Sequence, residues 1–240
     1  GVIWVGTDDG NVQLTRDSGQ TWVNLAERMK EAPGEAWVPF IEPSPHDAAT
    51  AFVVINDYRR NDWKPYIFKT TDFGKKWEQI VDENDVEGHT MAIVQDPVAA
   101  NLLFLGTDFG LYFTIDGGKK WHKWEDFPSV SVRDLKIHPR EHDLIIGTFG
   151  RSAWILDDIR PLREIAASNG DIFQQGFHVF KGPKRIAAYQ KAVSGTRFAA
   201  DAFYVAANKH RGMQLRLWIK EVTKNGKKDN PEAKEEEEKK

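Results

Sequence analysis

Short runs of apolar and β-branched residues alternate with clusters of turn residues along the first 160 positions of the chain. One well-defined stretch contains four such runs: Thr90–Val94, Leu102–Gly106, Gly110–Ile115 and Trp121–Trp124. The runs are bounded by Gly, Pro, Asp or Asn, which is the pattern of short β-strands joined by tight turns. We therefore expect four antiparallel strands in this stretch.

The same pattern recurs along the chain together with an eight-residue motif. Thr15–Trp22, Thr70–Trp77 and Thr114–Trp121 share the sequence Thr-x-Asp-x-Gly-x-x-Trp, and their Trp residues are separated by 55 and then 44 residues. A period of this length with four strands per unit is typical of β-propeller blades. We predict an all-β fold: a β-propeller of about four four-stranded antiparallel blades that is part of a larger propeller, followed by a short helix and a β-strand extension.

The limits of the blades follow from aligning the repeats. The first blade starts in its second strand, Val2–Gly6, the second and third span residues 37–80 and 89–125, and the last runs from Val132 to Asp157 with three strands. Two sources remain open for the fourth strand of the last blade: Phe177–Phe180, or an N-terminal strand that this sequence does not contain. The propeller is expected to occupy residues 1–160.

The pattern changes after the last blade. Residues 161–183 are expected to form a connecting helix, over Pro161–Ser168, and a strand. Met213–Lys220 alternates apolar and polar side chains, which predicts a half-buried strand. That residues 184–223 begin a C-terminal β-domain is what the family resemblance given below implies. The remaining segment, 224–240, is rich in Lys and Glu, and such a composition predicts a disordered tail.

The repeated motif has a structural interpretation on the hairpin between the third and fourth strands of a blade. We expect its Asp to accept backbone N–H bonds of the turn, its Gly to adopt positive φ, and its Trp to pack toward the neighbouring blade. These structural positions are Asp17, Gly19, Trp22, Asp72, Gly74, Trp77, Asp116, Gly118 and Trp121.

The motif resembles the Asp-box, or bacterial neuraminidase repeat (BNR), found in sialidases, xyloglucanase-type glycosidases, sortilin-type receptors and photosystem assembly factors. The segment Gly147–Leu162 further resembles the last propeller blade of large bacterial BNR-repeat proteins described as sortilin-like or glycosyl-hydrolase-like. This resemblance implies an exported multi-domain protein that is periplasmic, outer-membrane-associated or secreted. No signal peptide is visible in the sequence itself.

Composition narrows the possible chemistry. The chain has 9 Trp, no Cys and a formal net charge of −3, which excludes disulfides and thiolate catalysis and argues against a nucleic-acid partner. The sequence contains no run of 18 apolar residues, so we expect no membrane insertion. We expect no cofactor and no metal, because Pro139 interrupts the pair His138 and His142, and Asp82–Asp85 lacks the later positions of a calcium loop.

Ligand-binding candidates lie on the loops between strands two and three and on the connections between blades, which share one face of a propeller. They are Trp37, Tyr58, Arg59, Asp62, Trp63, His89, Asp108, Arg133, Asp134 and Arg151. The segment 57–63 stands out because it forms the longest insertion, and long loops on rigid scaffolds often carry binding residues. The alternative is structural: Arg133 and Arg151 would pair with Asp134 and Asp108 around the axis.

Two functions are therefore considered. The preferred one is a non-catalytic propeller module that binds a peptide, protein or carbohydrate on this face. The alternative is a glycoside hydrolase, sialidase- or xyloglucanase-like, which needs two carboxylates flanking the scissile bond. Asp8, Asp9, Asp62, Asp108 and Asp134 are candidates by location, but their spacing identifies no pair, so the catalytic residues and the oligomeric state stay open.

Overall fold

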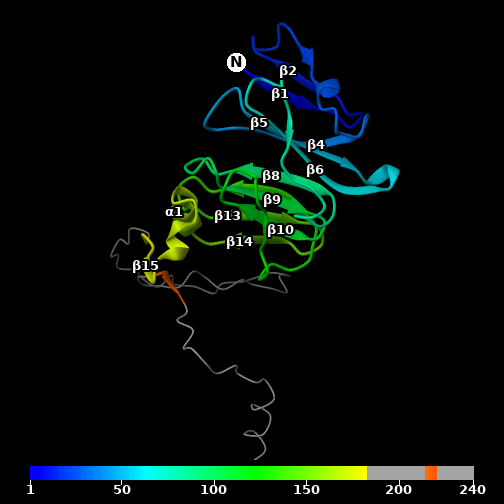
Figure 1. The fold of residues 1–240 in the computed structure, drawn as a ribbon. Helices are drawn as coiled ribbons and strands as arrows, with labels where there is room; N and C mark the ends of the chain where they lie inside the picture. The colour runs from blue at the N-terminus through cyan, green and yellow to red at the C-terminus, as the bar shows by residue number, and fades with distance from the viewer. Residues whose placement is uncertain (183–213, 221–240) are drawn as a thin grey trace, which may run out of the picture.

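The computed structural model describes residues 1–182 and 214–220, and these residues form mainly antiparallel β-sheet (Figure 1). The first two sheets consist of β1 (Ile3–Gly6), β2 (Val12–Thr15) and β3 (Val23–Asn24), and of β4 (Trp37–Pro43), β5 (Ala51–Asp57), β6 (Asp62–Thr70) and β7 (Glu78–Gln79). The next two consist of β8 (Thr90–Gln95), β9 (Leu103–Thr107), β10 (Gly110–Thr114) and β11 (His122–Lys123), and of β12 (Val132–Ile137), β13 (Leu144–Thr148) and β14 (Ala153–Leu156).

Each of these sheets is a meander in which strands that follow one another in sequence are hydrogen-bonded neighbours. The sheets follow one another along the chain (Figure 1), and β8 contacts both β4 and β12, the first strands of the two neighbouring sheets. This arrangement is that of consecutive β-propeller blades, as the repeat predicted. We name them blade 1 (β1–β3), blade 2 (β4–β7), blade 3 (β8–β11) and blade 4 (β12–β14).

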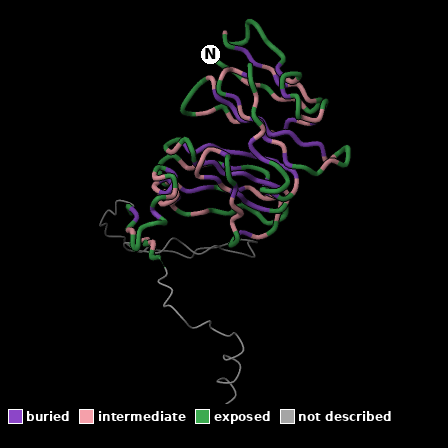
Figure 2. The backbone as a smooth tube through the Cα atoms, in the orientation of Figure 1, coloured by how far each residue is buried: buried purple, intermediate pink, exposed green. Residues whose placement is uncertain are grey.

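The hydrophobic core lies in layers between neighbouring blades. Blades 1 and 2 enclose Leu25 and Val53, blades 2 and 3 enclose Phe52 and Ile80, and blades 3 and 4 enclose a further layer around Leu135. Every residue of β5 and β8 is buried, because blades 2 and 3 are covered on both faces (Figure 2). Blades 1 and 4 are each covered on one face, so β14 has mostly exposed residues.

The second and third hairpins of the repeated motif share one hydrogen-bond pattern, whereas in the first the Asp17 carboxylate accepts bonds from the N–H (2.9 Å) and the hydroxyl (2.7 Å) of Thr21. The Asp116 carboxylate accepts bonds from the backbone N–H groups of Lys119 and Lys120 (3.0 and 3.1 Å) and from the Thr114 hydroxyl (2.7 Å). Thr114 in turn accepts the N–H of Gly118 (3.2 Å). Asp72 has the equivalent partners, and the bond from Lys76 is the largest cause that lowers the pKa of Asp72 below its usual value.

The motif glycines adopt the positive φ expected of them, with values of 96° at Gly19, 73° at Gly74 and 101° at Gly118. At Gly74 space is also restricted, since a Cβ atom would lie 2.4 Å from Leu25 Cδ1 of the preceding blade. The residue before each glycine also has positive φ, as in Ser18 at 62°, which the motif did not predict.

The motif Trp residues pack on the preceding blade. Trp121 of blade 3 is 5% exposed and donates from Nε1 to the carbonyl oxygen of Ile80 in blade 2 (2.7 Å). Trp77 of blade 2 meets Trp4 of blade 1 edge-to-face, with ring centroids 6.2 Å apart. For Trp22 the expected packing is wrong: it is 44% exposed, because no blade precedes blade 1 among the described residues.

A helical segment follows blade 4. It contains α1 (Arg160–Ala167), which confirms the expected helix to within one residue, and a 3₁₀ turn at Asp171–Gln174. The strand β15 (Phe177–Val179) pairs with β16 (Leu217–Ile219), so the interpretation of Phe177–Phe180 as the fourth strand of the last blade is wrong. Of the expected C-terminal β-domain, residues 184–213 and 221–223 lie outside the described residues, as does the expected tail 224–240.

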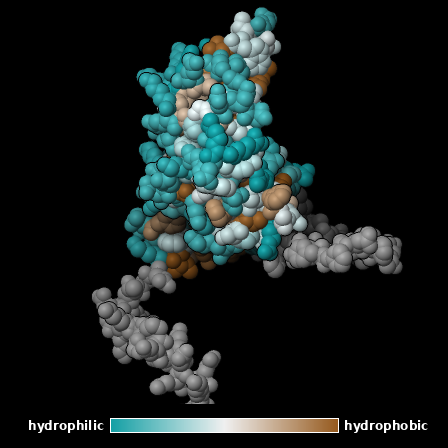
Figure 3. All heavy atoms as spheres, turned by 90° about the vertical axis from the view of Figure 1, so that its right-hand side faces the viewer, coloured by the Kyte–Doolittle hydropathy of each residue, from teal (hydrophilic) through white to brown (hydrophobic). Residues whose placement is uncertain are grey.

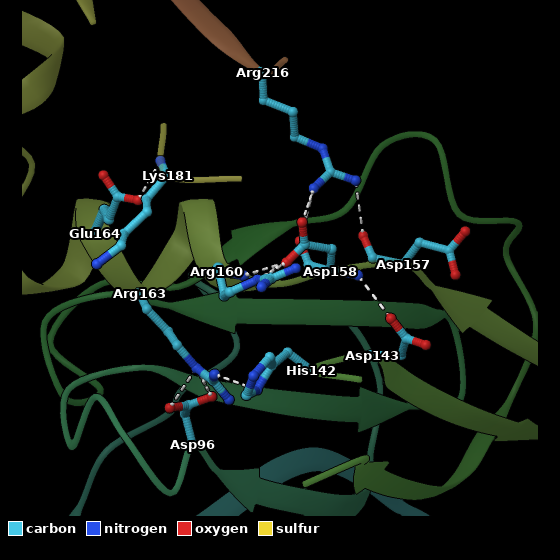
Figure 4. Close-up of polar contacts among 10 residues, drawn as sticks. All are labelled: Asp96, His142, Asp143, Asp157, Asp158, Arg160, Arg163, Glu164, Lys181 and Arg216. Carbon is cyan, nitrogen blue, oxygen red and sulfur yellow. Dashed lines mark hydrogen bonds and ion pairs between the residues drawn. The ribbon is translucent and has the colours of Figure 1, made fainter. Parts of the chain in front are cut away.

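A polar network joins α1 to the propeller (Figure 4). The Asp96 carboxylate, which is fully buried after β8, accepts two bonds from Arg163 Nε at 2.8 and 3.0 Å. His142 Nδ1 lies 2.8 Å from a terminal nitrogen of the same guanidinium. Beside this group, Asp158 forms ion pairs with both Arg160 and Arg216.

The described helices include none long and apolar enough to cross a membrane.

Candidate functional site

The segment 57–63 is not a long loop but the tip of an extended hairpin. Strands β5 and β6 continue to the pair Asp57–Asp62, and a 3₁₀ turn, η2 (Tyr58–Arg60), joins them. Asn61 closes the turn with a left-handed conformation, φ 65°. The hairpin is held by Arg60, whose Nε lies 2.7 Å from Asp57 Oδ1 and which also donates to the carbonyl of Gly34. The turn therefore presents Tyr58 and Trp63 on a rigid support.

Four aromatic side chains from three connections form one continuous cluster. The ring of Tyr58 stacks on His89 at 5.4 Å and lies 6.4 Å from Trp37 and 6.2 Å from Trp63. Trp63 also approaches His89, at 5.5 Å. The first and last of them, Trp37 and His89, are more than 50 positions apart in sequence. The propeller brings the four together because the blade connections converge on one face.

Two arginines border the aromatic rings. The guanidinium of Arg59 lies 5.1 Å from the centre of the Trp37 ring and 5.9 Å from that of Tyr58. Arg133, on β12, lies 5.4 Å over the ring of Phe149 and 4.0 Å from Asp108. Guanidinium groups over aromatic faces form cation–π contacts. We call the set Trp37, Tyr58, Arg59, Trp63, His89, Asp108 and Arg133 the aromatic–arginine cluster.

His89 connects the two halves of the cluster. It is 4% exposed, its Nε2 lies 3.9 Å from Asp108, and its Nδ1 has no hydrogen-bond partner among the described residues. Burial lowers the pKa of His89 below its usual value, and the charge of Arg133 acts in the same direction while Asp108 opposes both. The imidazole is therefore neutral at pH 7.

The outer part of the cluster is open to solvent. Trp63 is 52% exposed and its Nε1 donates to the Asn61 side chain (3.1 Å). Phe149 is 73% exposed beside Arg133. The η2 turn projects on the right-hand side of Figure 1, and Figure 3, which views the molecule from that side, shows a mostly hydrophilic surface with separate apolar patches. The face thus suits a polar ligand that also offers a ring or apolar group.

Three of the candidate residues do not join the cluster in the described contacts. Asp62 accepts a hydrogen bond from the Tyr66 hydroxyl (2.8 Å), and Asp134 accepts the backbone N–H of Leu135 (2.8 Å). Arg151 is exposed after β13, where its carbonyl accepts the Nε1–H of Trp154 (3.0 Å). The expected pairing of Arg133 with Asp134 is not seen; Arg133 faces Asp108 instead.

Sequence reasoning missed the residues that support the cluster from below. Asn56 accepts the backbone N–H of Tyr58 (3.1 Å) and donates to the carbonyl of Thr90 (3.1 Å), so it orients the η2 turn from inside blade 2. The thioether of Met91 contacts Asn56 and Arg133. Nothing in the repeat distinguishes these buried positions, although Phe149 could have been chosen because it follows Gly-Thr as Asp108 does.

A different group lies deeper along the inner strands. Glu42 is on β4, five positions beyond Trp37, and its Oε1 accepts the backbone N–H of Gln95 on β8 (3.4 Å). Burial raises the pKa of Glu42 above its usual value, and Asp134 on β12 adds to this while Lys136 opposes it. A carboxyl with a raised pKa keeps its proton to higher pH than an ordinary carboxyl, which is a property that general acids use.

The described residues contain no group of three or more His, Cys, Asp or Glu side chains that could hold a metal ion. His138 Nδ1 instead accepts the backbone N–H of Glu141 (3.0 Å), and His142 faces Arg163.

The pKa of Tyr66 is raised to about 12 by burial and by the hydrogen bond that its hydroxyl donates to the Asp62 carboxylate, so this hydroxyl stays protonated.

Comparison with solved structures identifies other propellers. An enzyme of glycoside hydrolase family GH74 from Niastella koreensis aligns with 65% of this chain and 26% of its own at 18% identity and a TM-score of 0.53. The GH74 xyloglucanase from Xanthomonas campestris aligns with 66% of this chain and 27% of its own at 17% identity and a TM-score of 0.54. YCF48 bound to D1 peptide aligns with 63% of this chain and 46% of its own, at 20% identity and a TM-score of 0.46.

The two GH74 comparisons support the propeller fold and say nothing of this chain's activity. The chain spans about a quarter of the length of the two GH74 structures. No protein-family profile matches the sequence. No curated protein matches it either.

Proposed function

We propose that this chain is a ligand-binding propeller module that holds a peptide, protein or carbohydrate on the face formed by the blade connections. The observation that carries the proposal is the aromatic–arginine cluster, in which stacked rings and two guanidinium groups from three blades meet on one exposed surface. Aromatic rings supply apolar contact area at low entropic cost, and arginine supplies directed hydrogen bonds to carboxylates or hydroxyls. Such residues dominate the energetics of binding surfaces.

The experiment compares defined probes on one immobilised protein. Xyloglucan oligosaccharides represent the carbohydrate class, and a library of short peptides with varied charge represents the peptide class. We expect Trp63→Ala or Arg59→Ala to weaken binding of the active probe by roughly tenfold or more, the loss typical of a central contact residue. The matched control is Trp22→Ala, which removes an equally large exposed ring from blade 1.

Equal affinity of the wild-type protein and both cluster variants would overturn the proposal. Both variants should fold, because Trp63 and Arg59 are exposed and contribute little to the core. Circular dichroism and thermal melting check this.

The alternative is a glycoside hydrolase, and one feature favours it: burial raises the pKa of Glu42 on β4, and the charge of Asp134 on β12 acts in the same direction. In this proposal Glu42 would protonate the leaving oxygen and Asp134 would act as the second carboxylate. The test is the release of reducing ends from xyloglucan and from sialylated glycans. If the protein releases reducing ends and both Glu42→Gln and Asp134→Asn abolish this activity, the hydrolase proposal replaces the binding proposal. If the glycans stay intact, the result counts against catalysis.

We also propose that the module belongs to an exported multi-domain bacterial protein, sortilin-like or glycosyl-hydrolase-like. The support is the resemblance of the Asp-box motifs and of Gly147–Leu162 to that class. Cell fractionation with an antibody against the module tests the location. Recovery in the cytoplasmic fraction would contradict it.

A further inference from the structure

One buried amide lies beneath the aromatic–arginine cluster and contacts two blades. Asn56, near the end of β5, is 1% exposed, and its Oδ1 accepts the backbone N–H of Tyr58 (3.1 Å). Its Nδ2 donates to the carbonyl oxygen of Thr90 (3.1 Å) and to the sulfur of Met91 (3.0 Å), both on β8. Every polar atom of this side chain therefore has a partner, in blade 2 or in blade 3.

Asn56 differs in its reach from the residues at the same position in blades 3 and 4. Asn56, Thr107 and Thr148 each pair with the first residue of the first strand of their own blade, so the strand register makes the three positions equivalent. The Thr107 hydroxyl accepts the N–H of Phe109 (3.1 Å), and the Thr148 hydroxyl donates to the carbonyl of Ser152, so both act within their own hairpin. Asn56 makes the equivalent bond to the second residue after it and also extends to the next blade.

Met91 continues this line of contacts to a third blade. Its side chain is 4% exposed, and its sulfur lies 3.5 Å from a terminal nitrogen of Arg133 on β12. Asn56 and Arg133 thus share one thioether as an acceptor. The contacts from Tyr58 through Asn56 and Met91 to Arg133 form a path under the surface, which we call the buried path.

A second path joins the same two ends at the surface. Tyr58 stacks on His89, His89 Nε2 lies 3.9 Å from Asp108, and Asp108 lies 4.0 Å from Arg133. Both of these distances are longer than a hydrogen bond, and charges that are partly open to solvent interact weakly. The buried path has contacts of 3.1, 3.0 and 3.5 Å, and both of its intermediate residues are buried. We therefore expect the buried path to be the stronger connection.

We propose that Asn56 is a positioning residue that couples the aromatic half of the cluster (Trp37, Tyr58, Arg59 and Trp63) to the arginine half (Asp108 and Arg133). The inference rests on the proposed function, since it makes the two halves one binding site. A fully satisfied buried polar network specifies a single arrangement of the groups that it holds, and a preorganised surface loses less entropy when it binds. Such a site favours a ligand that offers a ring and a hydrogen-bond acceptor within one molecule.

The first test needs no ligand. The Tyr58 amide donates to Asn56, so its hydrogen exchange, followed by NMR in the full chain, reports on the near end of the buried path. Arg133→Gln changes the far end, and we expect it to speed this exchange roughly threefold or more, as weakening one hydrogen bond of ordinary net strength does. Asn56→Thr keeps an acceptor for the amide, as Thr107 does for Phe109. In the Asn56→Thr background Arg133→Gln should have no effect on the Tyr58 amide.

Two further backgrounds separate the buried path from the surface path. Met91→Leu keeps the buried volume and removes the shared sulfur, so it should also abolish the effect of Arg133→Gln. His89→Gln interrupts the surface path and should leave that effect in place. Thermal melting checks that each variant is folded, and Met91→Leu carries the test if Asn56→Thr does not fold. Each comparison is made within one background, so a general loss of stability does not imitate coupling.

Binding gives a readout of a second kind. With the xyloglucan oligosaccharide or the library peptide that binds in the experiment on the proposed function, Trp63→Ala and Arg133→Gln are combined in a double-mutant cycle. We expect their losses in affinity to depart from additivity by roughly threefold or more in the otherwise unchanged chain. In the Asn56→Thr background the losses should be additive to within about twofold.

Three results would overturn the inference: Tyr58 exchange that Arg133→Gln leaves unchanged, an effect of Arg133→Gln that persists in both the Asn56→Thr and Met91→Leu backgrounds, or an effect that only His89→Gln abolishes. The last result would assign the coupling to the surface path. If no probe binds while the exchange results are as expected, the coupling of the two halves stands and the proposed function fails.

Discussion

The polar network at α1 and the aromatic–arginine cluster contain similar groups in different surroundings. Both place an arginine, an aspartate and a histidine together: Arg163, Asp96 and His142 in the network, Arg133, Asp108 and His89 in the cluster. In the network the Arg–Asp distance is 2.8 Å and Asp96 is fully buried. In the cluster the distance is 4.0 Å, and the aspartate and arginine side chains are 30% and 40% exposed.

The difference separates the structural role of the network from the binding role proposed for the cluster. Asp96 also accepts the N–H groups of Val98 and Ala99 (both 2.8 Å), so its oxygens are engaged and it fastens α1 to blade 3. Arg133 is held by a long ion pair and a ring, and its donors remain accessible to solvent and to a ligand. The same residue types therefore stabilise the fold where they are buried and are available for binding where they are open.

The largest expected effect is on stability and comes from the network. Arg163→Met leaves the buried Asp96 charge without its partner, so we expect unfolding free energy to fall by about 3–5 kcal/mol. The double variant Arg163→Met with Asp96→Asn should recover part of this loss, since the buried charge is gone. The matched variant Arg133→Met should change stability by less than about 1 kcal/mol. Urea denaturation measures all three, and equal losses for Arg163→Met and Arg133→Met would contradict the distinction.

A smaller effect concerns pH. Burial is the main cause that lowers the pKa of both His89 and His142, with Arg133 acting in the same direction on the first and Arg163 on the second. Unfolding raises these pKa values, so the unfolded chain binds more protons and stability falls as pH drops below about 6.5. Each histidine contributes at most about 1.4 kcal/mol per pH unit to the slope.

The substitutions His142→Gln and His89→Gln should each flatten the dependence of thermal stability on pH between 7 and 5. His142→Gln retains an acceptor for Arg163, so its stability at pH 7.5 should stay close to that of the wild type. A slope unchanged in both variants would show that other groups, such as the Asp-box carboxyls, determine the acid sensitivity.

The smallest expected effect on stability is at the exposed end of the cluster. Trp63 is 52% exposed, so Trp63→Ala should change unfolding free energy by no more than about 0.5 kcal/mol. Trp121→Ala serves as the contrast, because this Trp is 5% exposed and its loss should cost about 3–5 kcal/mol. Thermal melts of both variants check the difference. A large loss for Trp63→Ala would make that residue part of the fold rather than of a binding surface.

Much of the fold could be predicted because it repeats. All eight strand ends of blade 3 lie within one residue of their predicted limits, and the helix after blade 4 begins one residue before the predicted Pro161. Tight turns need Gly and Asp at fixed positions, so a short stretch of sequence is enough to predict the hairpins of the repeated motif. The error at Phe177–Phe180 arose because its partner, β16, is about 40 residues away and no local pattern specifies that pairing.

The candidate site could be predicted only in part. Seven of the ten candidates, all chosen from one face of the propeller, lie together in the aromatic–arginine cluster, and their role in binding stays a prediction. Asp62 on β6, Asp134 on β12 and Arg151 after β13 have other contacts. The supporting residues Asn56 and Met91 carry no signal in the repeat.

The sequence by itself determined the repeating unit, the Asp-box turns and the strands of each blade, since these depend on contacts between residues close along the chain. Only the tertiary structure decided which groups from different blades become neighbours. It stacked Tyr58 on His89 and placed Arg133 next to Asp108 instead of Asp134. The physical reason is that binding surfaces depend on distances across blades, which no short stretch of sequence encodes.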